Sequence, residues 1–178
     1  MNLPTHLGGH CGITHIDKNI LEYFKKAGAT SYLDIGCGPG GMLDEALSLG
    51  YDVQGVDGDF KVERKNPNKV CIHDYTNGPL TFDKSFDLVW SCEFVEHVEE
   101  KYLDNFMQTF SSGKTVCMTF APPNTPGHHH VNCNTEEYWI AIFEKYGFTF
   151  NQRLTKELRK KSSMKRKFFK KYGLVFKK

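Results

Sequence analysis

Short runs of β-favouring apolar residues alternate along the chain with segments whose apolar residues recur at helical spacing. Apolar residues at i, i+3 and i+4 give a helix one buried face, whereas a short run rich in β-branched residues is typical of a strand. Strand-like runs cover residues 31–35, 52–56, 70–73, 86–91, 115–120, 148–150 and 174–176, and helical patterns cover 17–27, 42–49, 99–110, 134–146 and 155–171. Strands that alternate with helices predict a mostly parallel sheet with helices on both faces.

Two polar residues mark predicted helix starts. Asp17 stands just before the apolar residues of the first helical pattern and is typical of an N-cap. Asn134 begins Asn-Thr-Glu-Glu, a capping-box pattern, so we expect a helix to open there and to run to about Tyr146.

Composition narrows the class of protein. With 178 residues and 39% apolar content, the chain is long enough for one domain with a full core. No apolar run approaches the roughly 18 residues that a membrane span needs, and no signal-peptide pattern is visible at the start. The six cysteines include no C-x-x-C pair, which argues against a zinc ribbon or an iron–sulfur cluster. We therefore predict a cytoplasmic protein with reduced thiols.

Charge is distributed unevenly along the chain. Residues 153–178 hold twelve Lys or Arg and one acid, a net charge of +11, which leaves 11 basic and 20 acidic residues, a net charge of −9, for residues 1–152. This asymmetry predicts an anionic partner for the tail, either RNA or an anionic lipid. Phe169 or Tyr172 would stack on bases if the partner were RNA, whereas Leu158, Met164 and Phe168 would pack inward.

The most informative stretch is Leu-Asp-Ile-Gly-Cys-Gly-Pro-Gly, residues 33–40, where a buried strand runs into a glycine-rich loop and then a helix. Glycines let the backbone approach a ligand closely, although Gly36, Gly38 and Gly41 alone would also satisfy a dinucleotide-binding pattern. The stretch closely resembles the first motif of class I S-adenosylmethionine-dependent methyltransferases. That resemblance implies a three-layer, Rossmann-like α/β fold, mostly parallel with an antiparallel C-terminal strand, and S-adenosyl-L-methionine as cofactor.

The resemblance also implies roles for three acids at strand ends. Asp34 would lie close to the methionine part of the cofactor, Asp57 would accept hydrogen bonds from the ribose hydroxyls, and Asp74 would face the adenine amino group. Each alone could be a turn residue, but three at matching strand ends favour the cofactor site. The full set of candidate cofactor residues is Asp34, Gly36, Cys37, Gly38, Gly40, Met42, Asp57, Gly58, His73, Asp74, Tyr75, Ser91 and Cys92.

After the fourth strand, Glu93, Glu96 and His97 form an E-x-x-E-H pattern, which on a helical turn would place all three on one face. The pattern resembles ubiquinone-pathway O-methyltransferases and small-RNA 3′-terminal 2′-O-methyltransferases. In the RNA group a further metal-binding His precedes a helix-opening Thr, and here His130 is the best match to that position, with His128 as the alternative. This chain departs from the RNA group by having Val-Asn-Cys-Asn before Thr135, where that group is rich in aromatic residues.

Two interpretations of this cluster stay open. Glu93, Glu96, His97 and His130 would hold Mg²⁺ or Mn²⁺ in one. In the other, the acids and His97 order the loop beneath the cofactor, and His97 or His130 acts as a general base.

The resemblance implies three segments. Residues 1–16, rich in Gly and His, would form a flexible lid or leader, with His15 the first residue there to test. Residues 17–154 would form the S-adenosylmethionine-binding methyltransferase domain. Residues 155–178 would add a basic helix and a short final strand to the same domain.

We predict an S-adenosylmethionine-dependent methyltransferase that acts on an oxygen, or else a nitrogen, of a small-molecule or RNA-terminal acceptor. Methylation of a DNA base amino group is disfavoured, because no Asn/Asp-Pro-Pro-Tyr follows the fourth strand. The alternative is a non-catalytic, S-adenosylmethionine-binding regulatory or accessory protein. The sequence indicates no oligomeric state.

Overall fold

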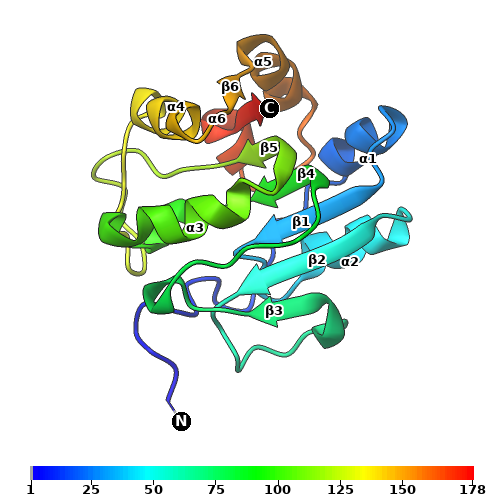
Figure 1. The fold of residues 1–178 in the computed structure, drawn as a ribbon. Coiled ribbons are helices and arrows are strands. Elements are labelled where there is room, and N and C mark those ends of the chain that lie inside the picture. Colours follow the sequence, from blue (N-terminus) through cyan, green and yellow to red (C-terminus); the bar gives the residue numbers. More distant parts are fainter. Residues whose placement is uncertain (1) are drawn as a thin grey trace.

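Seven strands form one sheet in the computed structural model, which describes residues 2–178 (Figure 1). They are β1 (Ser31–Ile35), β2 (Asp52–Asp57), β3 (Val70–Ile72), β4 (Phe86–Ser91), β5 (Gly113–Met118), β6 (Thr149–Phe150) and β7 (Leu174–Lys177). Their order across the sheet is β3-β2-β1-β4-β5-β7-β6. The neighbours from β3 to β5 pair in parallel, and β7 runs antiparallel between β5 and β6. The predicted sheet, mostly parallel with an antiparallel last strand, is confirmed.

Helices cover both faces of the sheet (Figure 1). They are α1 (Lys18–Lys26), α2 (Gly41–Ser48), α3 (Leu103–Phe110), α4 (Glu136–Lys145), α5 (Gln152–Lys161) and α6 (Phe168–Tyr172). Four single 3₁₀ turns, η1 (Pro67–Lys69), η2 (Tyr75–Asn77), η3 (Val95–His97) and η4 (Glu100–Tyr102), lie in the connections. Helices α3 and α4 pack on one face, and α1, α2, α5 and α6 pack on the other.

Two apolar cores result because successive side chains of a strand point to opposite faces. In β1, Leu33 and Ile35 join the core beneath α3 and α4, whereas Tyr32 joins the core beneath α1 and α2. In β4, Val89 and Trp90 divide between the cores in the same way. Strands that are buried on both faces require nearly continuous apolar runs, which is the pattern of this sequence.

The strand order reverses direction at β1, which pairs with β2 on one side and with β4 on the other. The loops that follow these strands therefore diverge and leave a crevice outside the strands' carboxyl ends. The fold thus positions the glycine turn after β1, the end of β2 and the loop after β4 around one opening.

Asp17 holds the C-terminal tail against the body and does not cap α1 as predicted. It occupies the N-cap position, but its side chain makes no capping hydrogen bond. The fully buried carboxylate accepts hydrogen bonds from the hydroxyl of Ser162 and from the N–H of Ser163, the latter at 2.9 Å. A contact between residues so far apart in sequence cannot be seen in a local capping pattern.

The tail is not the continuous helix that we predicted over 155–171. Helix α5 ends at Lys161, Ser162 turns to a φ of −49° and a ψ of 129°, and α6 begins only at Phe168. Asn19 braces this break by donating its side-chain amide to the Lys161 carbonyl at 2.8 Å. Because the loop is fixed by these contacts with the start of α1, helical propensity alone does not decide its shape.

The break also changes which aromatic residue of the tail enters the core. Phe169 is fully buried and stacks on Trp90 with ring centroids 5.2 Å apart, whereas Phe168 is only half-buried. Leu158 and Met164 are buried as predicted. The prediction that Phe169 is free to stack on bases is therefore wrong, whereas Phe168 packs against the same core but stays only partly buried.

Helix α4 begins one residue later than the capping pattern suggested. The hydroxyl of Thr135, not the side chain of Asn134, accepts the N–H of Tyr138 at 3.2 Å. Asn134 instead donates to the Asn132 side chain at 2.7 Å, so its amide is used in the preceding loop.

Within residues 2–178, every helix is too short or too polar to span a bilayer.

We expect Asp17→Ala to lower the free energy of unfolding by about 2–4 kcal/mol, because it leaves the buried hydroxyl of Ser162 and the part-buried N–H of Ser163 without their acceptor. Glu22→Ala is the control, since it removes only an exposed ion pair with Lys26 at 3.9 Å and should cost about 0.5 kcal/mol or less. Urea unfolding of the three proteins measures both effects. Equal, small losses would contradict the role given to Asp17.

Candidate functional site

A glycine turn joins β1 to α2 and approaches the end of β2. Gly36 donates its N–H to the Val56 carbonyl at 2.9 Å. Its φ is +74°, and a Cβ there would lie 2.6 Å from the Phe94 side chain, so only glycine fits. At Gly38, with a φ of +51°, a Cβ would lie 3.2 Å from the side chain of His10. The backbone of Gly38 and the ring of His10 are therefore in direct contact.

Asp57 ends β2 and is bonded to the glycine turn. Its Oδ2 accepts the N–H of Gly38 at 2.7 Å, and its Oδ1 accepts the N–H of Asp59 at 2.8 Å. Arg64 completes the arrangement, because its Nη2 lies 3.3 Å from Oδ1 and its Nε donates to the Gly38 carbonyl at 2.8 Å. These contacts fix the position of the Asp57 carboxylate relative to the turn.

The residues after β3 form the next part of the same edge. Asp74 accepts the N–H of Thr76 at 2.9 Å through Oδ1, and its Oδ2 lies 2.9 Å from Nε2 of His6. Tyr75 is buried and donates its hydroxyl to Thr109 at 2.9 Å. His73 has Nε2 at 3.0 Å from the carbonyl of Gly78.

Two cavities open at the carboxyl ends of the strands. Cavity A, about 100 Å³, is lined by the candidate residues Asp57, Gly58, His73, Asp74 and Tyr75. Cavity B, about 310 Å³, is lined by the candidate residues Asp34, Cys37, Gly38, Met42 and Cys92. Gly36, Glu93 and His97 line both cavities, so an elongated ligand would pass from A to B beside them.

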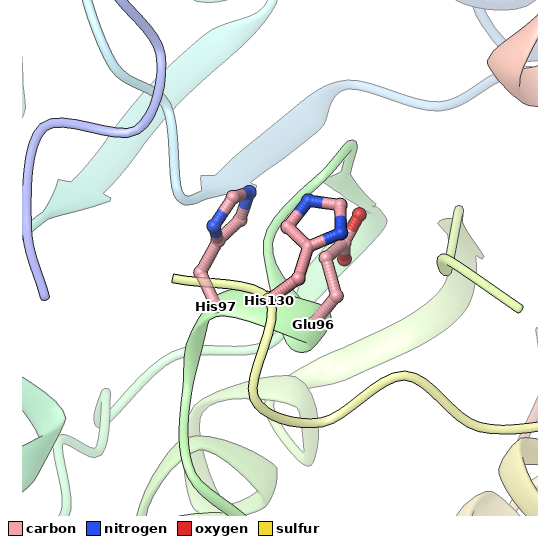
Figure 2. Close-up of side chains that lie close together, drawn as sticks. All are labelled: Glu96, His97 and His130. Carbon is pink, nitrogen blue, oxygen red and sulfur yellow. The ribbon is translucent and has the colours of Figure 1, made fainter. Parts of the chain in front are cut away.

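Glu96, His97 and His130 converge on one point from two loops (Figure 2). One potential ligand atom from each side chain lies within 4.8 Å of the others, and the two imidazole centroids are 4.9 Å apart. The carbonyl of Glu96 accepts the N–H groups of Val131 and Asn132 at 2.9 and 3.1 Å, which holds the His130 loop against η3. His130, not His128, is therefore the histidine that meets this cluster.

Backbone carbonyls set the orientation of both imidazoles. Nδ1 of His97 lies 2.7 Å from the carbonyl of His128, and Nδ1 of His130 lies 3.0 Å from the carbonyl of Thr125. A carbonyl is only an acceptor, so each Nδ1 carries the proton and each Nε2 keeps a free lone pair. The two Nε2 atoms are thereby positioned as ligands or bases.

Glu93 lies beside this cluster but not on the helical turn that we expected. Its φ is +54° and it precedes η3, so it does not share a helix face with Glu96 and His97. Thr119 holds it in place by donating its hydroxyl to Oε1 at 3.1 Å and accepting the Glu93 N–H at 2.8 Å.

Burial dominates the electrostatics of the cluster. It raises the pKa of Glu96 well above its ordinary value, and the negative charge of Glu93 raises it further. Both carboxylate oxygens of Glu96 are buried and find no hydrogen-bond donor among residues 2–178. Burial, followed by the charge of His130, lowers the pKa of His97 to about 4. The acid is thus uncompensated and the imidazole is neutral near pH 7.

Asp34 is a second uncompensated acid, at the end of β1. Burial raises its pKa to about 8, and the negative charge of Asp57 acts in the same direction. Its Oδ2 has no hydrogen-bond partner in the described part of the chain. A buried acid that lines a cavity without a partner is a candidate for contact with a cationic ligand group.

The N-terminal segment lies across both cavities. His6 contacts Asp74 as described, and His10 places Nε2 at 3.1 Å from the side chain of Asp59. Thr14 accepts the N–H of Gly41 at 3.1 Å and so satisfies a free donor at the start of α2. Met1, the first residue of the predicted lid, lies outside the described residues. Whether the segment opens and closes stays a prediction.

The basic tail reaches the site. Phe168 lines cavity B and meets His15, another lining residue, edge to face with ring centroids 4.9 Å apart. The tail therefore contributes an aromatic side chain to the wall of cavity B, and its predicted anionic partner stays a prediction. The sequence contained no local signal for this contact, because the break after α5 depends on Asp17.

Two candidate cofactor residues do not line either cavity. Ser91 is buried and donates its hydroxyl to the carbonyl of Ile35 at 2.9 Å, within the sheet. Gly40 is the left-handed N-cap of α2 and shapes the turn from behind. Conversely, His6 and Gly9 of the predicted lid and Phe94 within the E-x-x-E-H stretch line the cavities, although none of the three was predicted as a site residue.

One known protein family matches most of this chain. The profile of a family described as "Methyltransferase domain" matches residues 12–152. A ubiquinone biosynthesis O-methyltransferase from Ruegeria sp. (strain TM1040) is 30% identical over 159 residues, which cover 79% of this chain and 60% of that protein. The chain thus spans less than two thirds of the length of this relative.

Solved structures share the fold. Magnesium protoporphyrin IX methyltransferase from Synechocystis PCC 6803, with bound SAM, superposes with a TM-score of 0.61 at 15% identity, covering 88% of this chain and 74% of that one. The methyltransferase domain of bacterial CtHen1-C has a TM-score of 0.59 at 18% identity, covering 89% and 94%. At these identities the likeness supports the fold alone.

Asp34 predicts a pH-dependent contribution to stability. Its pKa of about 8 in the folded protein exceeds the ordinary 3.8, so the folded protein keeps a proton that the unfolded chain releases. Its stabilising effect is full below about pH 4 and is lost as the pH rises through about 8. Asp34→Asn cannot ionise, so its stability relative to the parent should increase by up to about 1.4 kcal/mol per pH unit over this window.

Urea unfolding at about pH 5, 6.5 and 8 measures this difference, with the exposed Asp83→Asn as the control. A difference between Asp34→Asn and the parent that does not change with pH would contradict the burial of a neutral Asp34.

Proposed function

Since the chain belongs to the class I S-adenosylmethionine-dependent methyltransferase family, we propose that it transfers a methyl group from S-adenosylmethionine to a hydroxyl oxygen of its acceptor. The observation that carries this proposal is the line of acids at neighbouring strand ends. Asp34 and Asp57 lie at the ends of β1 and β2, Asp74 follows β3, and all three line the two joined cavities.

The chemistry of the cavities fits the parts of this cofactor. Asp57 would accept hydrogen bonds from ribose hydroxyls in cavity A, and Asp74 would face the adenine. Asp34 in cavity B would meet the ammonium group of the methionine part, which would supply the positive charge that the buried carboxylate lacks. Gly36 lets the backbone come close where the two cavities join.

The sulfonium of the bound cofactor makes its methyl carbon open to attack, so the chain's own residues mainly position the acceptor and exclude water. The acceptor oxygen bonds to the methyl carbon while the carbon–sulfur bond breaks, and its electron pair returns to sulfur. The hydroxyl proton must leave, and where no cation occupies them, Nε2 of His97 or of His130 is free to accept it. Neutral His97 is available for this above about pH 4.

The cluster also fits a divalent cation. Glu96 offers two buried oxygens without donors, and His97 and His130 offer free Nε2 atoms whose orientation is fixed by backbone carbonyls. We propose that these three, with Glu93 beside them, hold Mg²⁺ or Mn²⁺, which when bound would polarise the acceptor hydroxyl. The unpaired carboxylate of Glu96 is what favours this over a loop-ordering role.

Ligand binding tests the first proposal. By calorimetry, S-adenosylmethionine and its demethylated product should bind, and NAD should not. Asp57→Ala should weaken binding by about 1–3 kcal/mol, because the ribose loses charge-assisted hydrogen bonds. Asp52→Ala is the matched control, since Asp52 lies at the other end of β2 and is exposed. Preferential NAD binding, or equal losses in the two variants, would count against the proposal. Tight cofactor binding without turnover of any acceptor would favour the non-catalytic alternative.

Cation binding tests the second proposal. Electron paramagnetic resonance should detect Mn²⁺ bound to the parent protein, and Glu96→Gln should weaken that binding on the order of tenfold or more. Glu99→Gln, which changes a half-buried acid paired with Lys101 and outside the Glu96–His97–His130 cluster, is the control and should retain Mn²⁺ binding. If the parent binds no Mn²⁺ at millimolar concentration, the metal proposal fails and proton transfer by His97 or His130 alone takes its place.

A further inference from the structure

We propose that cavity B has an anion-binding subsite at its mouth, formed by Arg166 and Lys167, which takes a phosphate or carboxylate group of the methyl acceptor. This inference rests on the proposed methyl transfer for the role of the cavity. It adds a substrate class to that proposal: an acceptor that carries a negative charge near the hydroxyl to be methylated.

Placement of the loop between α5 and α6 is the first observation. The buried Asp17 holds Ser162 and Ser163, and Asn19 binds the loop through its N–H, which lies 3.2 Å from Oγ of Ser163. The loop therefore runs beside the start of α1 (Figure 1). Residues 165–167 follow directly, and so they are carried to the rim of the cavity by a fixed support.

Contact with the cavity is the second observation. Phe168, next to Lys167, lines cavity B together with His15 and His130. The charge of Arg166 also reaches this wall. Burial lowers the pKa of His15, and the positive charge of Arg166 lowers it further, so this charge acts on a residue of the cavity wall. Arg166 and Lys167 also directly precede Phe168, which belongs to the same wall.

Lack of compensation is the third observation. Lys165, Arg166 and Lys167 are exposed and form no ion pair with any residue from 2 to 178. Other tail cations are paired: Arg159 lies 2.7 Å from Glu136, and Lys161 lies 3.8 Å from Glu157. In a body whose net charge is −9, unpaired cations at one cavity mouth favour the approach and retention of an anionic group. A neutral acceptor would gain nothing from them.

The subsite is distinct from general attraction by the tail. Lys170 and Lys171 on α6 are also exposed, and they follow Phe168 along the helix instead of lying on the loop that leads to it. They therefore provide a matched control with the same charge and nearly the same sequence position. A double variant at either pair removes two positive charges from the tail.

The test compares Arg166→Gln with Lys167→Gln, made together, against Lys170→Gln with Lys171→Gln, also together. Each protein is saturated with S-adenosylhomocysteine, and that first titration reports separately on the proposed cofactor site. Calorimetry then follows the binding of pyrophosphate and of a short single-stranded RNA. Flotation follows binding to vesicles of phosphatidylglycerol, with phosphatidylcholine vesicles as the reference.

We expect the 166/167 variant to bind pyrophosphate or the RNA at least fivefold more weakly than the parent, and the 170/171 variant to change by less than about twofold. S-adenosylhomocysteine binding should be the same in all three proteins. Equal weakening by both variants, binding to vesicles alone, or no detectable binding of any anion by the parent would overturn the subsite. Failure to bind S-adenosylhomocysteine would instead reject the proposed function.

Discussion

The parallel pairing of β1 with β2 and with β4 is the constraint on which the site depends. Ile35 stands opposite Val56, and Asp34 stands opposite Trp90, so the ends of three strands lie side by side. Gly36 adds a hydrogen bond from the turn to the end of β2. Because of this register, an acid at each strand end and a glycine turn become one surface. A shift of one residue in any pairing would turn these side chains into the cores.

Two buried acids at this surface lower the stability of the free protein. Asp34 and Glu96 are buried almost completely, and each has at least one carboxylate oxygen without a donor within the described chain. Unpaired buried acids cost stability in the free protein, and both proposals assign a ligand to them: Asp34 lines cavity B, and Glu96 lies against His97 and His130, which line it. An ammonium group suits Asp34, and a divalent cation suits Glu96 with two neutral imidazoles. Asp57, by contrast, is held by contacts within the protein, with Gly38 and with Arg64.

The sequence predicted those parts of the fold that depend on the local residue pattern or that follow from the family resemblance. The strands at 31–35 and 86–91 were predicted with their observed bounds, because burial on both faces demands continuous apolar runs. The convergence of Glu96, His97 and His130 followed from motif spacing. Long-range contacts account for what was missed. Asp17 binds Ser162 and Ser163, which lie near the other end of the sequence. These hydrogen bonds break the tail helix, so Phe168 reaches cavity B.

A crystal structure with bound S-adenosylhomocysteine would test the central claim most directly. We predict that the ligand spans both cavities, with its ammonium group within hydrogen-bonding distance, about 3 Å, of the Asp34 carboxylate and its ribose hydroxyls at the same distance from Asp57. The glycine turn would face the amino-acid part of the ligand. A ligand that lies outside these cavities, or one that leaves the Asp34 carboxylate without a partner, would contradict the account.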